Sequence, residues 1–290
     1  MKPIALLFAT TALLPLTVPA FSQEEVGKRK GEAIKIRWTT YDEAKNYSIE
    51  HESAIPRSTV KTIATELEDA LGQYVLLFKF KPDRKLKVKF LDSPNTYEQE
   101  GGKPSTAGHF DPGTGYLVLK QLSFEDLIPT TYHEAFHQYL HYYVGQGVEI
   151  PTWFNEGMAG YFQEMKRQKG TKKLDYKLID NRKLRMTRDK VMTRTALPLH
   201  DLVNASYTDF HDRVESLKEA PFYNQSFSVI YFFMNGMGGR PAFQFADELK
   251  KKKDVAAAME KVFGKDLKNF KSFEEKWKGF MAQLKIDEKV

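Results

Sequence analysis

The sequence predicts an α+β fold in which a mixed-sheet lobe with one helix is followed by a mainly helical lobe. Apolar and polar residues alternate at 33–40 and at 86–90, as expected for strands with one buried face. Residues 58–77, and most segments in the second half of the chain, instead show the three- and four-residue apolar spacing of helices. We therefore expect residues 23–128 to form the sheet-containing lobe and residues 129–290 the helical lobe.

Residues 1–22 have the composition of a secretory signal peptide. Lys2 precedes an apolar stretch at 4–16, and cleavage is expected after Ser22 or after Ala20. The apolar stretch is too short to span a membrane, so the sequence predicts no transmembrane segment. We expect the mature chain to be exported, either to the periplasm or out of the cell.

The sheet-containing lobe is expected to hold a helix and a hairpin in addition to the two strands. The helix at 58–77 has Ser58 as a candidate cap. Its apolar face is formed by Val60, Ile63, Leu67 and Leu71. Residues 108–110 and 116–120 flank a segment with one proline and two glycines, which predicts a β-hairpin.

A helix at about 130–143, between the two lobes, carries an H-E-x-x-H pattern in His133, Glu134 and His137. Residues four apart lie one turn above each other on a helix, so both histidines can direct a ring nitrogen to one Zn²⁺. Glu134 lies beside them, where a carboxylate can take a proton from water. The apolar stripe of this helix comprises Ile128, Tyr132, Ala135, Phe136, Tyr139 and Tyr143.

A third metal ligand is expected on the following helix, because catalytic zinc takes three protein ligands and keeps one open position. Pro151 and Thr152 suit a helix start, and the helix is predicted to run to about residue 168. Glu156 follows His137 by nineteen residues, so a helical hairpin can bring it to the same ion. Taken alone, Glu156 is better explained as a first-turn glutamate stabilised by the helix dipole. Small residues are expected to let the two helices of this hairpin approach closely, namely Gly157, Ala159 and Gly160.

Together, His133, His137 and Glu156 resemble the gluzincins, zinc peptidases such as thermolysin whose third ligand is a glutamate on a second helix. Residues 155–159 match their N-E-x-x-A signature, and the run at 153–157 is similar to small bacterial peptidase MA-like proteins. The specific part of the resemblance covers residues 105 to 235.

One position departs from this family pattern. Thermolysin-like enzymes have an aspartate one turn after the glutamate ligand, and that aspartate accepts a hydrogen bond from the first histidine. Gly160 stands at this position here, so another group must accept the bond.

The resemblance implies an exported, zincin-like metallopeptidase with one Zn²⁺ per chain, with peptides or proteins as substrates. It implies that Glu134 is the general base. It also implies that the hairpin at 108–120 forms the cleft edge and pairs with the substrate backbone, for which an ordinary sheet edge is the alternative. A hydrogen-bond donor for the oxyanion is expected from a later helix. Tyr223 is the best candidate for this donor, and His200 and His211 are the alternatives.

Two other classes of function remain open on the sequence. The chain could be a cell-envelope binding or assembly protein that keeps the fold without turnover, or a zinc hydrolase of non-peptide amides. Glu134 argues against the first class, because a structural zinc site has no use for a base. A metzincin site is excluded, because Tyr143 occupies the position of its third histidine. His141 lies about 12 Å along the helix from His133 and is expected to be a cleft-wall or packing residue.

Charge and composition limit the possible partners. The formal charge is +6, and basic residues cluster at 166–173 and 250–253. Solvated loops and helix ends are the ordinary explanation for such clusters. A weak attraction to an anionic envelope surface is the more specific interpretation. No nucleic-acid-binding motif accompanies the charge, so no nucleic acid partner is expected. The chain has no cysteine, so its core must stabilise it without disulfide bonds.

The rest of the helical lobe is expected to be polar and irregular up to Arg194. A short helix is predicted at 197–202, and an apolar helix at 222–233 that stops at Asn235. Two or three amphipathic helices are predicted from Pro241 onward.

Overall fold

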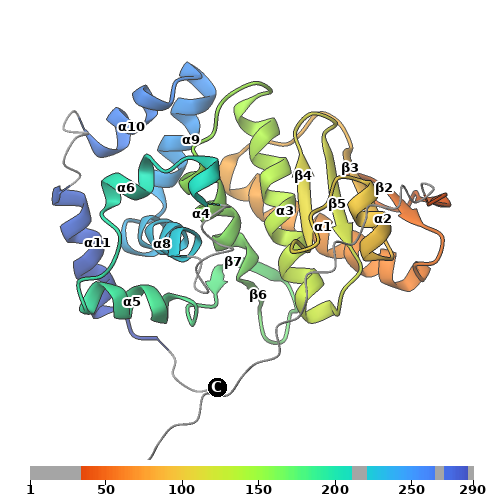
Figure 1. Ribbon diagram of the computed structural model, residues 1–290, viewed down its shortest axis with the longest axis horizontal. Helices are drawn as coiled ribbons and strands as arrows, with labels where there is room; N and C mark the ends of the chain where they lie inside the picture. Colours follow the sequence, from red (N-terminus) through yellow and green to blue (C-terminus); the bar gives the residue numbers. More distant parts are fainter. Residues whose placement is uncertain (1–33, 211–220, 265–270, 287–290) are drawn as a thin grey trace, which may run out of the picture. The chain divides into compact units, whose positions relative to one another are not determined.

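A computed structural model places residues 34–290 in one compact unit, of which residues 34–210, 221–264 and 271–286 are described (Figure 1). The predicted signal peptide at 1–22 and His211 lie outside the described residues. No helix among the described residues has the length and apolar character needed to cross a membrane.

A five-stranded mixed sheet forms the first part of this unit. Its strands are β1 (Trp38–Tyr41), β2 (Tyr47–Glu52), β3 (Leu86–Leu91), β4 (Gly108–Asp111) and β5 (Tyr116–Lys120). They are arranged in the order β1-β2-β3-β5-β4. The pairs β2–β3 and β3–β5 are parallel, whereas the outer strands β1 and β4 are antiparallel to their neighbours. β4 is therefore an edge strand.

Three helices accompany the sheet: α1 (Arg57–Phe78), α2 (Pro94–Gln99) and α3 (Phe124–Val144). α1 connects the parallel strands β2 and β3, and it packs against α3 through Tyr74 and Phe136, whose ring centroids are 5.3 Å apart. Gln138 of α3 donates hydrogen bonds to the carbonyl oxygens of Lys87 and Gly115, at 2.9 Å each. These contacts fix the position of α3 along the sheet.

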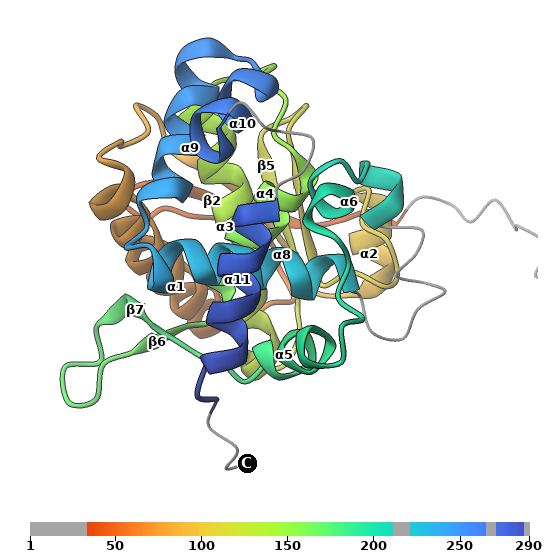
Figure 2. The same ribbon diagram turned by 90° about the vertical axis from the view of Figure 1, so that its left-hand side faces the viewer.

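The second part of the unit is mainly helical. It comprises α4 (Thr152–Gln163), the hairpin β6 (Met165–Arg167) and β7 (Leu174–Ile179), α5 (Leu184–Met192), α6 (Leu199–Val203), α8 (Pro221–Tyr231), the π-helical turn η1 (Phe232–Gly236), α9 (Arg240–Lys252), α10 (Val255–Phe263) and α11 (Lys271–Gln283). α4 contacts both α3 and α8, and the β6–β7 hairpin projects from the helices in Figure 2. The predicted α+β class, with a mixed sheet first and helices second, is confirmed.

The main apolar core joins the sheet to the helices. Its aromatic centre includes Phe136 of α3 stacked on Phe162 of α4, with ring centroids 4.5 Å apart. Trp153 and Phe154, at the start of α4, are fully buried and both contact Phe245 of α9. α3 and α4 therefore cannot move apart without opening this core.

In the sheet, one predicted strand is shorter than expected, and two elements were not predicted. The strand expected at 33–40 begins only at Trp38, and three of its four residues, including Trp38, are exposed. β2 is buried on alternate positions, but its polar and charged residues hide this pattern in the sequence. α2 is a six-residue helix, which is too short to show a periodic pattern.

The bounds of the two central helices also differ from the prediction. α3 begins at Phe124, where the Ser123 side chain accepts a hydrogen bond from the backbone N–H of Asp126, and it continues through Pro129. α4 ends at Gln163 rather than near residue 168, because the chain then enters the β6–β7 hairpin. The segment up to Arg194, which was expected to be irregular, contains this hairpin and α5.

Candidate metal centre and catalytic cleft

Helix α3 brings the rings of His133 and His137 together. Ala135, Phe136 and Tyr139 on the same helix are fully buried in the core, which sets the rotation of α3 about its axis. The two histidines, four residues apart, then lie one above the other on the side that lines a cleft. Their Nε2 atoms are 3.1 Å apart, close enough to bind one metal ion.

Helix α4 adds Glu156 to this pair. The Oε2 atom of Glu156 lies 3.4 Å from Nε2 of His133 and 3.6 Å from Nε2 of His137. Among the described residues, these three side chains are the one group of at least three potential metal ligands whose donor atoms all lie within 4.8 Å of one another. The sequence predicted these three residues as the ligand set.

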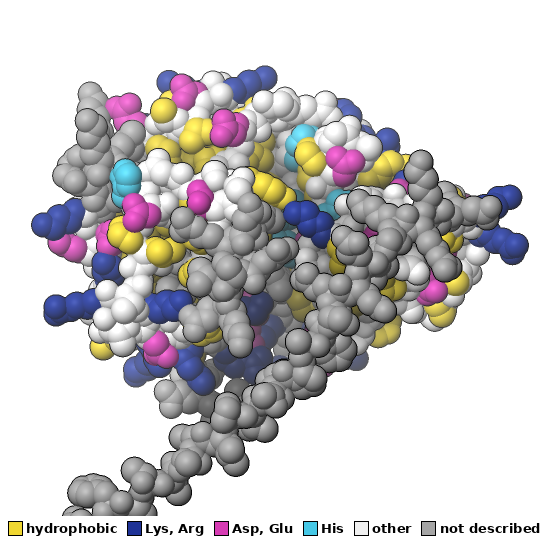
Figure 3. All heavy atoms as spheres, viewed as in Figure 1, with side chains coloured by type: hydrophobic (Ala, Val, Ile, Leu, Met, Phe, Trp, Pro, Cys, Tyr) yellow, Lys and Arg dark blue, Asp and Glu magenta, His cyan; other side chains and the backbone are white. Residues whose placement is uncertain are grey.

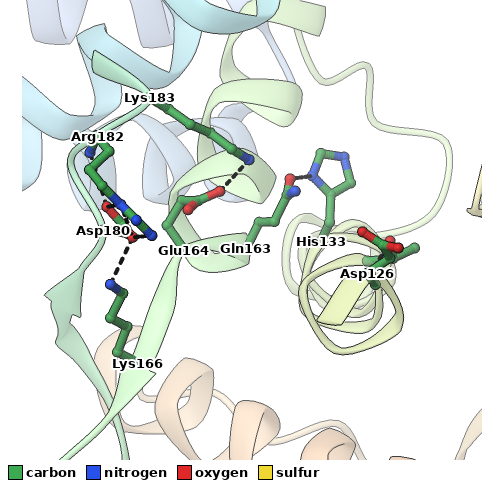
Figure 4. Close-up of polar contacts among 9 residues, drawn as sticks. Asp126, His133, Gln163, Glu164, Lys166, Asp180, Arg182 and Lys183 are labelled. Carbon is green, nitrogen blue, oxygen red and sulfur yellow. Dashed lines mark hydrogen bonds and ion pairs between the residues drawn. The ribbon is translucent and has the colours of Figure 1, made fainter. Parts of the chain in front are cut away.

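Each histidine is oriented through its second ring nitrogen. Nδ1 of His133 lies 3.0 Å from Oε1 of Gln163, as Figure 4 shows, and Nδ1 of His137 lies 2.8 Å from Oδ1 of Asn155. An amide oxygen only accepts hydrogen bonds, so each Nδ1 carries the proton. Each Nε2 faces the other ligands and can offer its lone pair to a metal ion once it carries no proton, which is how metal-binding histidines are usually held.

Gln163 is the acceptor that the sequence could not assign. It lies three residues after Gly160 on α4, where a side chain projects on nearly the same face, and its longer side chain reaches His133. Asn155 was visible in the sequence as the first residue of the N-E-x-x-A signature, but its contact with His137 was not predicted. The position of Gln163 within one turn of the expected acceptor is the one signal that pointed to it.

The charges at this point favour a bound cation. Burial lowers the pKa of His137, but the carboxylate of Glu156 outweighs burial, and the pKa rises to about 9. Burial also tends to raise the pKa of Glu156, but the imidazoles of His137 and His133 outweigh it and hold this pKa well below its usual range. Without a metal, Nε2 of His137 therefore holds a proton at neutral pH, and a metal ion at this buried point would take the place of that proton.

The donor set fits zinc in type and in spacing. Zinc binds two imidazole nitrogens and one carboxylate oxygen in many catalytic sites. Ligand atoms bound to a tetrahedral zinc ion lie about 3.3 Å from one another. The separations of 3.1, 3.4 and 3.6 Å among the three donor atoms are close to this value.

Glu134 lines the same cleft beside the ligands. A Cβ atom on Gly108 would lie 3.0 Å from Cγ of Glu134 and 3.2 Å from Cγ2 of Thr130, so glycine allows β4 to pass close to α3. No hydrogen bond or ion pair of Glu134 occurs within the described part of the chain. Its carboxylate is therefore available to a molecule bound in the cleft.

The cleft has a volume of about 760 Å³, and Tyr223 of α8 lies in its wall. Burial, together with the negative charges of Glu156 and Glu134, raises the pKa of Tyr223 above its usual range. Its hydroxyl stays protonated at neutral pH and can donate a hydrogen bond. Figure 3, in the view of Figure 1, shows histidine side chains in cyan at the surface near the middle of the face that is drawn.

His200, the alternative donor on α6, does not line the cleft. Its side chain is about half exposed and lies beside Asp201, with Nδ1 3.3 Å from the Asp201 carboxylate. The structure thus brings Tyr223, but not His200, to the cleft that contains Glu134. His211 falls outside the described residues.

The two glycines of α4 face a different helix from the one expected. A Cβ atom on Gly157 would lie 2.8 Å from the carbonyl oxygen of Ser226 and 2.8 Å from the Ile230 side chain, both on α8. At Gly160 the nearest atom is Cβ of Phe227, also on α8, at 3.8 Å. These two glycines therefore allow a close approach between α4 and α8 rather than the expected one between α4 and α3.

Comparisons with known proteins identify one family model. It is described as a protein of unknown function (DUF1570), and it matches residues 127–255, a range that contains α4, α8 and nearly all of α3. No curated protein matches the chain.

Three solved structures are similar to the chain at low sequence identity. An aminopeptidase N family protein from Idiomarina loihiensis has a TM-score of 0.48 and 14% identity, over 88% of this chain and 47% of that one. Aminopeptidase A from Legionella pneumophila, in complex with aspartic acid, has a TM-score of 0.41 and 17% identity, over 84% and 28%. An M1 zinc metallopeptidase from Deinococcus radiodurans, bound to a Tyr-Ser-Ala substrate, has a TM-score of 0.38 and 10% identity, over 87% and 53%. The chain thus spans about half or less of the length of these proteins.

Proposed function

We propose that this protein is a zinc-dependent peptidase that hydrolyses peptide bonds with activated water. One observation carries the proposal: the donor atoms of His133, His137 and Glu156 converge at zinc-ligand spacing, with the Glu134 carboxylate beside them in an open cleft. A zinc ion at this point supplies a Lewis acid, which makes water more acidic and polarises a carbonyl group.

The side chains at the site have separate roles in the proposed reaction. Gln163 and Asn155 hold the two imidazoles with Nε2 directed inward. Glu134 takes the proton from water as it attacks the carbonyl carbon, and then gives this proton to the leaving amine. Tyr223 donates a hydrogen bond to the oxyanion that develops on the carbonyl oxygen.

The edge strand β4 offers a means of holding a peptide in the cleft. Its partner β5 occupies one edge, and β4 is the last strand in the sheet order, so its other edge can pair with an extended backbone. Gly108, His109 and Phe110 of β4 all line the cleft. This supports the role that the resemblance to gluzincins assigns to the hairpin.

We further propose that the protein acts outside the cytoplasm, because residues 1–22 have the composition of a signal peptide. Its substrates are then peptides or proteins that it meets after export. The basic clusters remain compatible with a weak attraction to an anionic envelope surface.

The decisive test replaces Glu134 by Gln, which keeps the volume of the side chain and removes the base. We expect the Glu134→Gln protein to retain its zinc, measured by elemental analysis, and to lose at least about 10²-fold in peptide hydrolysis. Equal activity in parent and variant would move the chemistry away from this site. A parent that holds zinc but cleaves nothing in a broad peptide library would instead favour the binding-protein alternative.

A further inference from the structure

The cleft continues along α3 for one helical turn beyond the metal ligands. Its wall includes α3 residues from Thr130 to His141, and eleven helical steps span about 16 Å. An extended peptide advances about 3.3 Å per residue, so this length accommodates about five residues. The turn that carries His141 can therefore contact a substrate residue next to the bond that is cleaved.

β4 runs in the same direction as α3 beside this cleft. Gly108 lies against Thr130 and Glu134, and two residues later Phe110 lies against His141. The two ends of the cleft thus have different walls. The cleft wall also includes the polar side chains of Lys103 and Thr106.

The end near His141 is apolar. The ring centroids of Phe110 and His141 are 5.2 Å apart, with the planes inclined by 58°. Val148 and Ile150, from the loop between α3 and α4, are half-buried and complete the wall. This loop changes direction at Gly145 and Gly147, whose φ angles of 103° and 76° favour glycine.

His141 contributes to this wall as a neutral ring. Burial lowers the pKa of His141, so the imidazole is uncharged at neutral pH. Its Nε2 atom is buried and has no hydrogen-bond partner among the described residues. None of Phe110, His141, Val148 and Ile150 offers a charge, so an ionised substrate side chain placed among them would lose its hydration without compensation.

We propose that Phe110, His141, Val148 and Ile150 form a specificity subsite for an apolar substrate side chain, aromatic or branched aliphatic, adjacent to the cleaved bond. The subsite is continuous with the cleft that holds Glu134 and the metal ligands. This inference rests on the proposed peptidase function for its role in cleavage, but the recognition itself is measurable without turnover.

The test uses zinc-loaded Glu134→Gln protein and fluorescent pentapeptides. Each position of the pentapeptide is varied in turn, and the varied position carries Phe, Leu, Gly, Asp or Lys. Fluorescence anisotropy should show, for one position along the peptide, that Phe and Leu bind at least about tenfold more tightly than Asp or Lys. Val148→Phe, which fills the subsite, should weaken binding of the Phe peptide about tenfold and leave the Gly peptide unchanged. Ile150→Asp, which introduces a charge, should weaken the Phe and Leu peptides as well.

Gln146→Phe is the matched control, because Gln146 lies on the same loop, is exposed and does not line the cleft. It should bind every peptide as the parent does, and circular dichroism should show that all variants are folded. Equal binding of Phe and Asp peptides at every position, no peptide binding, or a Phe preference that survives both subsite variants would overturn the subsite. An apolar preference that both variants abolish, in a parent protein that cleaves nothing, would keep the subsite and reject the peptidase function.

Discussion

The Nδ1 atom of His133 lies 3.0 Å from Oε1 of Gln163, so the last residue of α4 holds a metal-facing histidine of α3. The chain then leaves α4 at once: the following residue, Glu164, forms an ion pair with Lys183 (Figure 4). The end of α4 is thus held by contacts of both Gln163 and Glu164. The position of Gln163, and with it the tautomer of His133, depends on where α4 ends.

Replacing Gln163 by Leu should lower the affinity for zinc by about 10- to 100-fold, because the His133 ring loses the acceptor that orients it. The measurement is a competition titration of the zinc-loaded protein with a chelator. Glu164→Gln changes the adjacent residue, which pairs with Lys183 rather than with a ligand, and should leave the affinity near the parent value. Identical affinities in the two variants would show that Gln163 does not support the site.

The purified mature protein should bind about one zinc ion per chain through its three ligands. His133→Ala or His137→Ala should abolish binding, and Glu156→Ala should weaken it strongly. His141→Ala is the control on the same helix and should leave the stoichiometry unchanged. Zinc content after dialysis reports each outcome. A Glu156→Ala protein that binds zinc as tightly as the parent would contradict the gluzincin-like ligand set.

Tyr223→Phe should lower kcat by roughly 10- to 10³-fold, because it removes one hydroxyl that can donate to the oxyanion. Zinc content and thermal stability should be unchanged. Tyr207 is a second tyrosine in the cleft wall, and it is exposed, so Tyr207→Phe is the matched control. His200→Ala should also keep full activity, since His200 lies outside the cleft. A larger loss of kcat in either control than in Tyr223→Phe would assign the donor elsewhere.

Gly157→Ala should destabilise the fold by about 1–3 kcal/mol, because the added methyl group meets the backbone of α8 and cannot be accommodated without a shift. Gly160→Ala adds the same methyl group on the same helix, where the nearest atom is 3.8 Å away. It should be neutral or stabilising, since alanine favours a helix over glycine. Urea unfolding curves of the two variants measure the difference. Equal stability losses would mean that α4 and α8 are not closely packed at Gly157.

Local sequence determined the elements that carry the chemistry. The spacing of His133 and His137 requires a helix to bring the two rings together, and the surrounding apolar residues favour one. The helix 58–77 and the hairpin at 108–120 were likewise visible, because their periodicity and turn residues act over a few positions. Strand β2 was hidden, because only two of its three buried residues, Tyr47 and Ile49, are apolar, and the third, His51, is buried only in the folded sheet.

The tertiary structure decided what depends on contacts between distant segments. Gln163 became the acceptor for His133 because α4 ends there and packs against α3, thirty residues earlier in the chain. Gly157 allows α8 to pack closely against α4. Phe110 contacts His141 only because β4 is the edge strand of the sheet beside α3. Such contacts leave no periodic pattern in the sequence, because they arise between elements whose relative placement is set by the whole core.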